Sequence, residues 1–526
     1  MNDENSYNLI DEAWIPVLMK DGSNRVVSLG DIFADTDGAI ADLALNPYER
    51  VAVFRLLLCI AQAALEIESE REWFAAKETI GPICSNYLEK WRDRFFLFGF
   101  HAFLQVDCLV SGGTIPDTSR LILRSAHHFG SPLFSREIDT QSDIPLSPAV
   151  LAISLLTYLN YSASGGTPTC IWKGRPTQQV GAAASPCRSQ SKLFTFLLGP
   201  TLLETIWMNL LTARQISSLK IDKGRPCWEF FFDECNSVED DAQHWLGPVD
   251  KVSRRAKEPT LLGVLVPLSR FIKLKYNDRK CLICEGFSYP SWRDPYATYY
   301  GRPEKNGKEK IVPLRVNMNR MPWRDLASIL ELGTDKGGAV VLDHLATLSP
   351  RLDADRTFSI WTGGMCSDAD RDKDMVVGEW WFTRRMSALR KQDLHDYRAA
   401  IDLAEQQKSI LYLACKTYGL AVKTSDPTKQ VKKQKETELV SPFSIPAERV
   451  YWDILAQPEN QKIVLCVESE TYMDDWKEAT RKAAEEAYRR ACPAVTARQM
   501  EAFAQGFAKL RVHGVNNTDI VQKGIM

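Results

Sequence analysis

Apolar side chains recur at helical spacing among many charges in residues 384–416, RRMSALRKQDLHDYRAAIDLAEQQKSILYLACK. One face of this stretch carries Leu394, Tyr397, Ile401, Ala404 and Leu411. Residues 471–507 show the same spacing, with Ala484, Ala487, Tyr488 and Ala491 on one face. Amphipathic helices of this length pack against one another to bury their apolar faces. The sequence therefore predicts an all-helical bundle at the C-terminal end of the chain.

The sequence before this bundle has a mixed character. Residues 8–17 and 25–29 read as two strands, and Asp21-Gly22 between them indicates a hairpin turn. Residues 50–67 are strongly apolar and predict a buried helix, and Ser147-Pro148 is typical of a helix start. We therefore expect a large mixed α/β domain over residues 1–375 and the helical bundle over residues 376–526.

Composition bounds the functions that this chain can have. The 526 residues include 65 Lys and Arg against 67 Asp and Glu, which gives a net charge of −2. This balance excludes a strongly basic domain that coats nucleic acid, but it allows a locally basic groove. The 13 cysteines form no disulfide framework, and no signal peptide or unbroken membrane-length apolar run is visible. We expect a reduced, cytoplasmic protein with no membrane partner.

The chain offers little that points to catalysis or to a cofactor. Cys281 and Cys284 form a CxxC pair on an expected turn-rich knuckle, but a structural zinc site normally needs four ligands and no second CxxC is present. Cys170 and Cys187 are the candidate spatial partners. We favour a free thiol pair, and predict no metal and no cofactor.

Common hydrolase motifs are absent, so a protein without catalytic residues is favoured. The alternative is a metal-dependent nuclease that uses the acidic residues near Asp368 together with His127-His128, the only close pair of histidines.

The remaining signal is a globular body with glycine-rich and basic loops and a lysine-rich bundle. That combination is typical of a protein that binds and positions a nucleic acid rather than one that catalyses a reaction on it. Residues 423–435 hold five lysines against one acid, and a later helix carries further basic side chains. The candidates for contact with the DNA backbone are Lys432, Lys433, Arg481, Lys482 and Arg489.

The order of the short motifs along the chain resembles the CasA family, the large subunit of the type I-E CRISPR Cascade surveillance complex. Each motif is short, but they are collinear over nearly the whole sequence. The motifs that carry the resemblance are residues 8–17, residues 50–60, Phe103-Leu104-Gln105-Val106, Leu133-Phe134, Pro145-Leu146-Ser147-Pro148, Ser164-Gly165-Gly166, the Cys281–Cys284 segment, Trp292-Arg293-Asp294-Pro295 and Gly363-Gly364.

The resemblance implies a mixed α/β N-terminal domain followed by a four-helix bundle. It also implies a subunit that is not an enzyme. Such a subunit recognises the protospacer-adjacent motif, promotes duplex opening and R-loop formation, and helps recruit a separate helicase-nuclease. The implied partners are a double-stranded DNA target, the CRISPR guide RNA, other Cascade subunits and the helicase-nuclease effector.

The resemblance also implies where the sites lie. A glycine loop would approach the DNA motif, and it comprises Ser164, Gly165, Gly166 and Thr167. A wedge loop after Gly363-Gly364 would enter the duplex, and it includes Ser367, Asp368 and Ala369. The family often carries glutamine in this wedge, whereas this sequence has Ala369.

Two further family sites are less complete in this sequence. A loop over residues 129–143 would contact the guide-RNA end of the complex, with Phe134 and Arg136 as the candidate contacts. The family's motif-reading lysine has no counterpart between Cys284 and Arg302, and the first CxxC of its zinc site is absent around residues 142–149.

Overall fold

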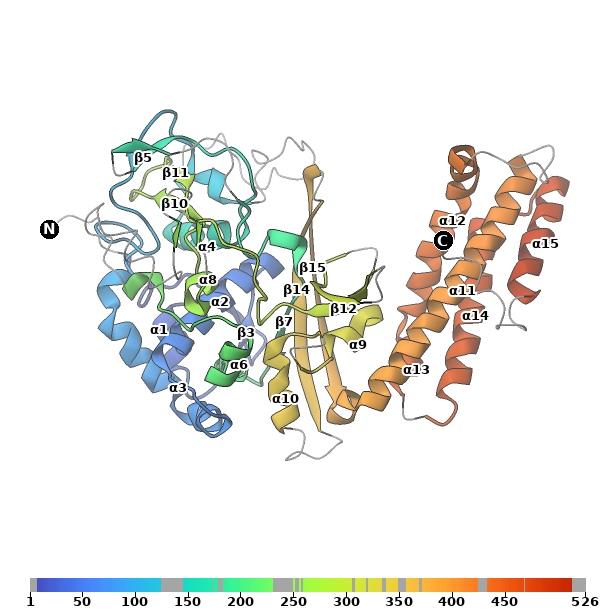
Figure 1. Ribbon diagram of the computed structural model, residues 1–526, viewed down its shortest axis with the longest axis horizontal. Coiled ribbons are helices and arrows are strands. Elements are labelled where there is room, and N and C mark those ends of the chain that lie inside the picture. Colours follow the sequence, from blue (N-terminus) through green and yellow to red (C-terminus); the bar gives the residue numbers. More distant parts are fainter. Residues whose placement is uncertain are drawn as a thin grey trace. The chain divides into compact units, whose positions relative to one another are not determined.

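The chain forms two compact units, residues 1–386 and 387–526 (Figure 1). The boundary predicted between residues 375 and 376 falls inside strand β15 (Arg371–Arg385), whose pairing with β14 (Thr357–Asp368) keeps it in the first unit. The computed structural model describes residues 7–123, 145–172, 174–177, 183–229, 249–250, 255–256, 259–304, 308–317, 320–333, 337–348, 356–368, 371–423, 433–467 and 469–512.

The first unit opens with the predicted hairpin. Strand β1 (Ile15–Met19) pairs antiparallel with β2 (Asn24–Val27) and with β3 (Ile40–Leu43), in the order β2-β1-β3. Helix α1 (Leu29–Ala34) follows β2, and its Ser28 cap accepts a hydrogen bond from the backbone N–H of Asp31. The hairpin prediction is confirmed, although its first strand begins later than expected because the preceding residues form turns.

The core of this unit forms around α2 (Pro47–Ala64), the apolar helix predicted from the sequence. Residues 50–62 of α2 are buried throughout. This helix packs against α3 (Glu70–Lys90), α4 (Pro148–Tyr161) and other elements of the unit. Ser147 caps α4 as predicted. The other helices of this unit are α5 (Leu202–Met208), α6 (Ala213–Ser218), α8 (Leu261–Leu265), α9 (Leu326–Ile329) and α10 (Asp343–Leu348).

Small antiparallel sheets surround this core. The two longest strands, β14 and β15, form a sheet with β7 (Phe194–Leu198) in the order β15-β14-β7. The remaining strands are β4 (Val110–Ser111), β5 (Cys170–Trp172), β6 (Arg175–Pro176), β8 (Val249–Asp250), β9 (Arg255–Ala256), β10 (Arg270–Lys273), β11 (Leu282–Glu285), β12 (Tyr299–Pro303) and β13 (Glu309–Pro313). Short 3-10 turns include η3 (Thr118–Leu121), η5 (Ser189–Ser191) and η7 (Pro322–Asp325).

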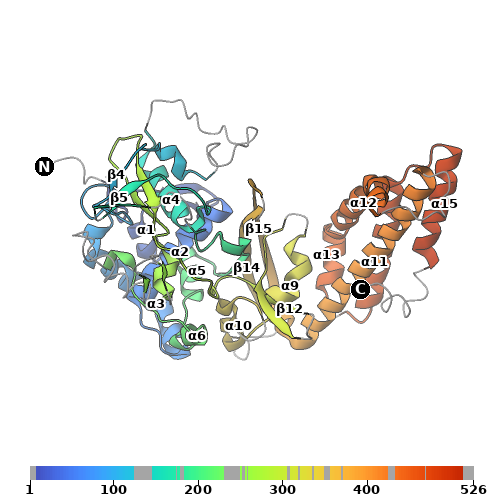
Figure 2. The ribbon, with the colours of Figure 1, turned by 45° about the horizontal axis from the view of Figure 1, so that its top comes forward.

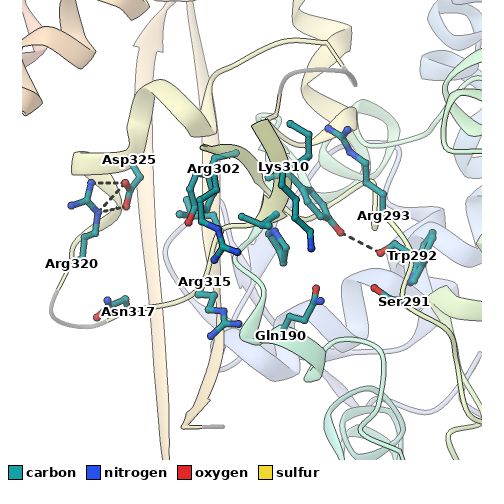
Figure 3. Close-up of a pocket in the computed structure, with 16 residues that line it drawn as sticks. Gln190, Ser291, Trp292, Arg293, Arg302, Lys310, Arg315, Asn317, Arg320 and Asp325 are labelled. Atoms are coloured by element: carbon teal, nitrogen blue, oxygen red, sulfur yellow. Dashed lines mark hydrogen bonds and ion pairs between the residues drawn. The ribbon is translucent and has the colours of Figure 1, made fainter. Parts of the chain in front are cut away.

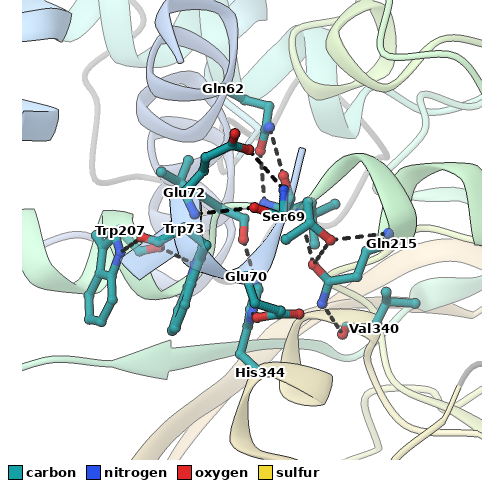
Figure 4. A network of polar contacts seen from close by, with 12 residues as sticks. Gln62, Ser69, Glu70, Glu72, Trp73, Trp207, Gln215, Val340 and His344 are labelled. Carbon is teal, nitrogen blue, oxygen red and sulfur yellow. Dashed lines mark hydrogen bonds and ion pairs between the residues drawn. The ribbon is translucent and has the colours of Figure 1, made fainter. Parts of the chain in front are cut away.

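A buried aromatic network joins α3, α5 and α10 (Figure 4). The indole N–H of Trp73 donates to the Trp207 carbonyl at 3.2 Å, and the indole N–H of Trp207 donates to the Trp73 carbonyl at 2.6 Å. The His344 ring stacks on Trp73 with 4.2 Å between centroids. Its Nε2 lies 2.6 Å from the Leu210 carbonyl, and its Nδ1 lies 3.8 Å from a Glu70 oxygen.

The second unit is the predicted bundle. Its long helices are α11 (Lys391–Lys423), α12 (Lys433–Leu455), α14 (Tyr472–Ala491) and α15 (Ala497–Val512), and a short α13 (Pro458–Leu465) follows α12. Helix α11 packs against α12, α14 and α15, and both views show these helices side by side (Figure 2). The predicted faces are buried at Tyr397, Ala404 and Tyr488. The four-helix prediction is confirmed.

No helix among the described residues combines the length and the apolar character needed to cross a membrane.

Candidate nucleic-acid interface

The predicted glycine loop is an exposed connection between α4 and β5. Ser164, Gly165 and Gly166 are exposed, whereas Thr167 is buried. Gly165 has a φ of +127°, and a Cβ built on it meets no atom within 4 Å. Glycine is needed at Gly165 for its backbone conformation rather than for space inside the protein. The loop therefore offers open backbone that a ligand can approach closely.

A chain of buried hydroxyl groups holds the base of this loop. The Ser162 Oγ lies 2.5 Å from the Ser185 Oγ, which lies 2.7 Å from the Ser269 Oγ. The Ser269 hydroxyl donates to the Leu159 carbonyl at 2.6 Å, and the Ser185 N–H donates to the Ser162 carbonyl at 3.0 Å. Because each hydroxyl has a buried hydrogen-bond partner, these bonds fix the position of the backbone on which the loop begins.

Arg270 adds a buried positive charge beneath the loop. The residue is 2% exposed, and its guanidinium donates to the carbonyls of Ser269 at 2.6 Å, Ala183 at 2.9 Å and Ala163 in the loop itself. Burial lowers the pKa of Arg270 from its usual value. Among the described residues no carboxylate forms an ion pair with it. Glu285 lies opposite Arg270 in the β10–β11 pairing and offsets part of its charge, and the remaining positive potential favours the approach of an anion to the nearby surface.

The predicted wedge lies at the tip of a long β-hairpin. Strand β7 pairs only with residues 359–363 of β14, so the rest of β14 and β15 continues as a two-stranded ribbon (Figure 1). Gly363 and Gly364 lie inside β14, opposite Glu379 and Gly378, rather than at the start of a loop. A Cβ on Gly364 would lie 2.8 Å from the Lys192 carbonyl, so close packing accounts for this glycine. The expected loop is therefore shorter than the sequence indicated.

A basic pocket that the sequence analysis missed lies beside the β12–β13 hairpin (Figure 3). Its volume is about 1000 Å³. Arg302, Lys310 and Arg315 line it together with Gln190 and several aromatic side chains. These residues come from separate segments of the chain, so no single stretch of sequence predicts the pocket. The only sequence signal was the positive charge of the residues themselves, together with the lack of acidic residues next to Arg315.

Comparisons with known proteins identify the family. The profile of the CRISPR-associated protein Cse1 family matches residues 8–491. The chain belongs to this family. A curated relative, CRISPR-associated protein CasA/Cse1 of Thermus thermophilus, is 26% identical over 515 residues, which is 95% of each chain. The CasA resemblance found in the sequence is confirmed.

Solved Cse1 structures have the same fold. The CasA of Thermus thermophilus is 23% identical, with a TM-score of 0.71 and coverage of 96% of this chain and 98% of that one. Thermobifida fusca Cse1 is 18% identical, with a TM-score of 0.74 and coverage of 97% and 98%. A chain of a solved CRISPR RNA-guided surveillance complex is 17% identical, with a TM-score of 0.67 and coverage of 96% and 99%.

Several predicted site residues of this Cse1 chain lie outside the described residues. They are His127, His128, Phe134, Arg136, Ala369 and Lys432. Ser367 and Asp368 end β14, and Lys433 begins α12. The guide-RNA contacts, the exact wedge residue and the lysine contacts therefore stay predictions.

The basic side chains predicted on α14 all have acidic neighbours. Arg481 pairs with Glu478 at 2.7 Å and with Glu485 at 2.5 Å. Lys482 lies 3.5 Å from Glu478, and Arg489 lies 3.5 Å from Glu485. The signal was present in the sequence, because residues three and four apart on a helix are neighbours. Such exposed pairs contribute only about 0–1 kcal/mol, so phosphates can compete for these arginines.

The knuckle predicted at the CxxC pair, Cys281 and Cys284, is wrong. Cys284 lies within β11, opposite Phe271 of β10, and Cys281 immediately precedes this strand. Side chains three apart along a strand point to opposite faces, so the two thiols do not converge on one ion. The Cys281 thiol lies 3.8 Å from the Asp117 carbonyl, whereas the Cys284 thiol donates to the Glu285 carbonyl at 3.6 Å.

The CxxC pair is also poorly suited to metal binding in its chemistry. Burial raises the pKa of Cys281 to about 12, which disfavours the thiolate that a metal requires. Within the described ranges, no group of three or more His, Cys, Asp or Glu side chains lies close enough to hold a metal ion.

Proposed function

We propose that this Cse1-family chain is a non-catalytic DNA-recognition subunit of an RNA-guided CRISPR interference complex. It recognises the protospacer-adjacent motif, promotes duplex opening and R-loop formation, and helps recruit the helicase-nuclease. Family membership and a shared fold with a chain of an RNA-guided surveillance complex support this proposal. In such complexes base pairing with the guide reads most of the target, while protein reads the short motif.

The observation that carries the proposal is the exposed glycine loop above the buried Arg270. The minor groove is only about 6 Å wide, so backbone without side chains enters it most easily. Gly165 and Gly166 provide such backbone, and the Arg270 charge beneath them attracts the phosphates on either side. Buried hydroxyls fix the base of the loop, so little order has to be gained when DNA binds.

The tip of the β14–β15 hairpin is the proposed wedge. Ser367 and Asp368 precede the tip, and Arg371 pairs with Asp368 across it. Proteins that separate base steps insert a protruding segment between them. A two-stranded ribbon supported by β7 at its base has the required shape, because its tip can enter a duplex while its strands stay paired.

The nuclease alternative gains no support. The family model and the curated relative reported above are not named as nucleases, and the histidine pair of this alternative lies outside the described residues. The acidic side chains that are described form no cluster suited to a catalytic metal.

The test replaces Gly166 with phenylalanine in the assembled complex. Gly166 is exposed and has no positive φ, so Gly166→Phe should fold normally, whereas Gly165→Phe would add backbone strain. Asn24→Phe, on the exposed side of β2, is the matched control. We expect Gly166→Phe to weaken binding to a matched duplex at least tenfold with an unchanged melting temperature. Equal affinity of Gly166→Phe and the control would refute this role of the loop.

A further inference from the structure

Several separate segments build the basic pocket beside β12 and β13. Hydrogen bonds from the Val316 N–H to the Ser191 carbonyl at 3.0 Å and from the Leu193 N–H to the Leu314 carbonyl at 2.8 Å join two of these segments. This pairing places Arg315 next to the turn that contains Gln190. Arg302 and Lys310 reach the same space from the hairpin, and Figure 3 shows the three basic side chains directed toward Gln190.

The pocket places positively charged side chains close to one another, and their repulsion destabilises the fold. Arg302 lies directly opposite Lys310 in the β12–β13 pairing, and like charges at such positions destabilise a sheet. No ion pair involves Arg302, Lys310 or Arg315 within the described part of the chain. Asp325, the one acid among the described residues that line the pocket, is held by Arg320 at 2.7 Å. A bound anion would relieve this repulsion.

Gln190 presents its amide to the pocket from a strained backbone. Its φ is +68° and that of Ser191 is +51°, values that non-glycine residues rarely adopt. Strain of this kind persists where the surrounding structure imposes it, and it is common at ligand-binding sites. The Gln190 side chain is exposed and has no hydrogen-bond partner among the described residues. A free amide offers both donors and an acceptor, as the edge of a nucleobase requires.

Aromatic side chains complete the lining. Tyr299, Tyr300 and Trp292 all face the pocket, and the Tyr299 hydroxyl donates to the Trp292 carbonyl at 3.3 Å. The Trp292 indole N–H is buried without an acceptor in the part of the chain described. Aromatic surfaces beside cationic groups are the combination with which proteins bind unpaired nucleotides.

From these features we infer that the basic pocket is a nucleotide-binding site. Arg302, Lys310 and Arg315 bind separate phosphate groups, the aromatic side chains contact the base or sugar, and Gln190 reads an edge of the base. The pocket volume is typical of small-ligand sites and admits unpaired nucleotides rather than a duplex. The ligand is therefore a nucleoside phosphate, either free or as part of a single strand. This inference concerns the isolated chain and does not depend on the proposed function.

The test measures binding of fluorescein-labelled single-stranded oligonucleotides to the purified full-length chain by anisotropy. The variant is Arg302→Ala with Lys310→Ala, and the charge-matched control is Lys20→Ala with Arg25→Ala, two exposed residues outside the pocket. We expect the pocket variant to lose at least tenfold in affinity. Its slope of log K against log salt should also flatten by about 1.4, because each phosphate contact with a single strand contributes about 0.7.

Two further arms identify the ligand and the role of the amide. Gln190→Ala should leave the salt slope unchanged but reduce the difference in affinity between oligo-dA, oligo-dC and oligo-dT. Competition by free ATP identifies a free nucleotide as the ligand, whereas competition only by unlabelled oligonucleotide identifies a strand. Either result supports the nucleotide-binding site if Arg302→Ala with Lys310→Ala lowers the affinity for the ligand that is identified. Equal binding of oligonucleotide and ATP by the pocket variant and the control would overturn the inference.

Discussion

Replacing Arg270 with methionine tests how the glycine loop is held. Methionine keeps an unbranched apolar side chain but removes the guanidinium that donates to the carbonyls of Ala163, Ala183 and Ser269. A hydrogen bond from a charged donor contributes about 1.5–3 kcal/mol. The sum over three bonds is reduced because the buried charge itself is costly and because water can reach the half-buried Ala163 and Ala183.

We therefore expect Arg270→Met to lower the free energy of local opening around the loop by about 2–4 kcal/mol. Since about 1.4 kcal/mol is a factor of ten, the opening equilibrium should increase roughly 30- to 1000-fold. Hydrogen exchange measured by mass spectrometry reports this directly at the Ser185 N–H, which donates to the Ser162 carbonyl. Arg25→Met, an exposed arginine, is the control. Unchanged protection in Arg270→Met would refute the role of Arg270 as the anchor of the loop.

Three other predictions follow from the described contacts. The neighbouring His344 ring lowers the pKa of Glu70 from its ordinary 4.5. The ionised carboxylate therefore stabilises the fold above pH 4.5, and this stabilisation is lost as the pH falls through the lowered pKa. Glu70→Gln should consequently lose less stability than the wild type on acidification in urea titrations, and parallel losses would contradict this. Purified protein should contain well under one zinc per chain by elemental analysis, because the CxxC thiols point apart; one tightly held zinc would show that distant ligands complete a site. Arg481→Ala with Arg489→Ala should flatten the salt slope for duplex binding by the assembled complex by about 2, and an unchanged slope would remove both arginines from the DNA path.

Local patterns in the sequence predicted much of the fold. The apolar run of α2, the Ser147-Pro148 start of α4 and the helical spacing in α11 each depend on neighbours within a few turns. The knuckle prediction was wrong because the β-branched Ile283 between the two cysteines favours an extended strand, and this strand pairs with β10. That outcome depends on a partner strand, which the CxxC spacing does not reveal.

The candidate sites were harder to predict for the same reason. The glycine loop is visible in the sequence, but its anchor Arg270 lies about a hundred residues further along the chain. The pocket needs Gln190 and Arg315 to meet through backbone pairing, and no local pattern encodes that contact. On α14 the information was local, and counting the acidic residues beside Arg481 would have predicted its ion pairs.

Motif selection by the assembled guide-RNA complex tests most directly whether this chain recognises the flanking motif. Target duplexes with randomised bases beside the guide-matched segment are bound, recovered and sequenced, with the wild-type chain, with Gly166→Phe and without the chain. We expect the wild-type chain to enrich a short flanking motif and both other samples to lose this enrichment. The same flanking-base distribution in all three samples would contradict the claim that this chain recognises the motif.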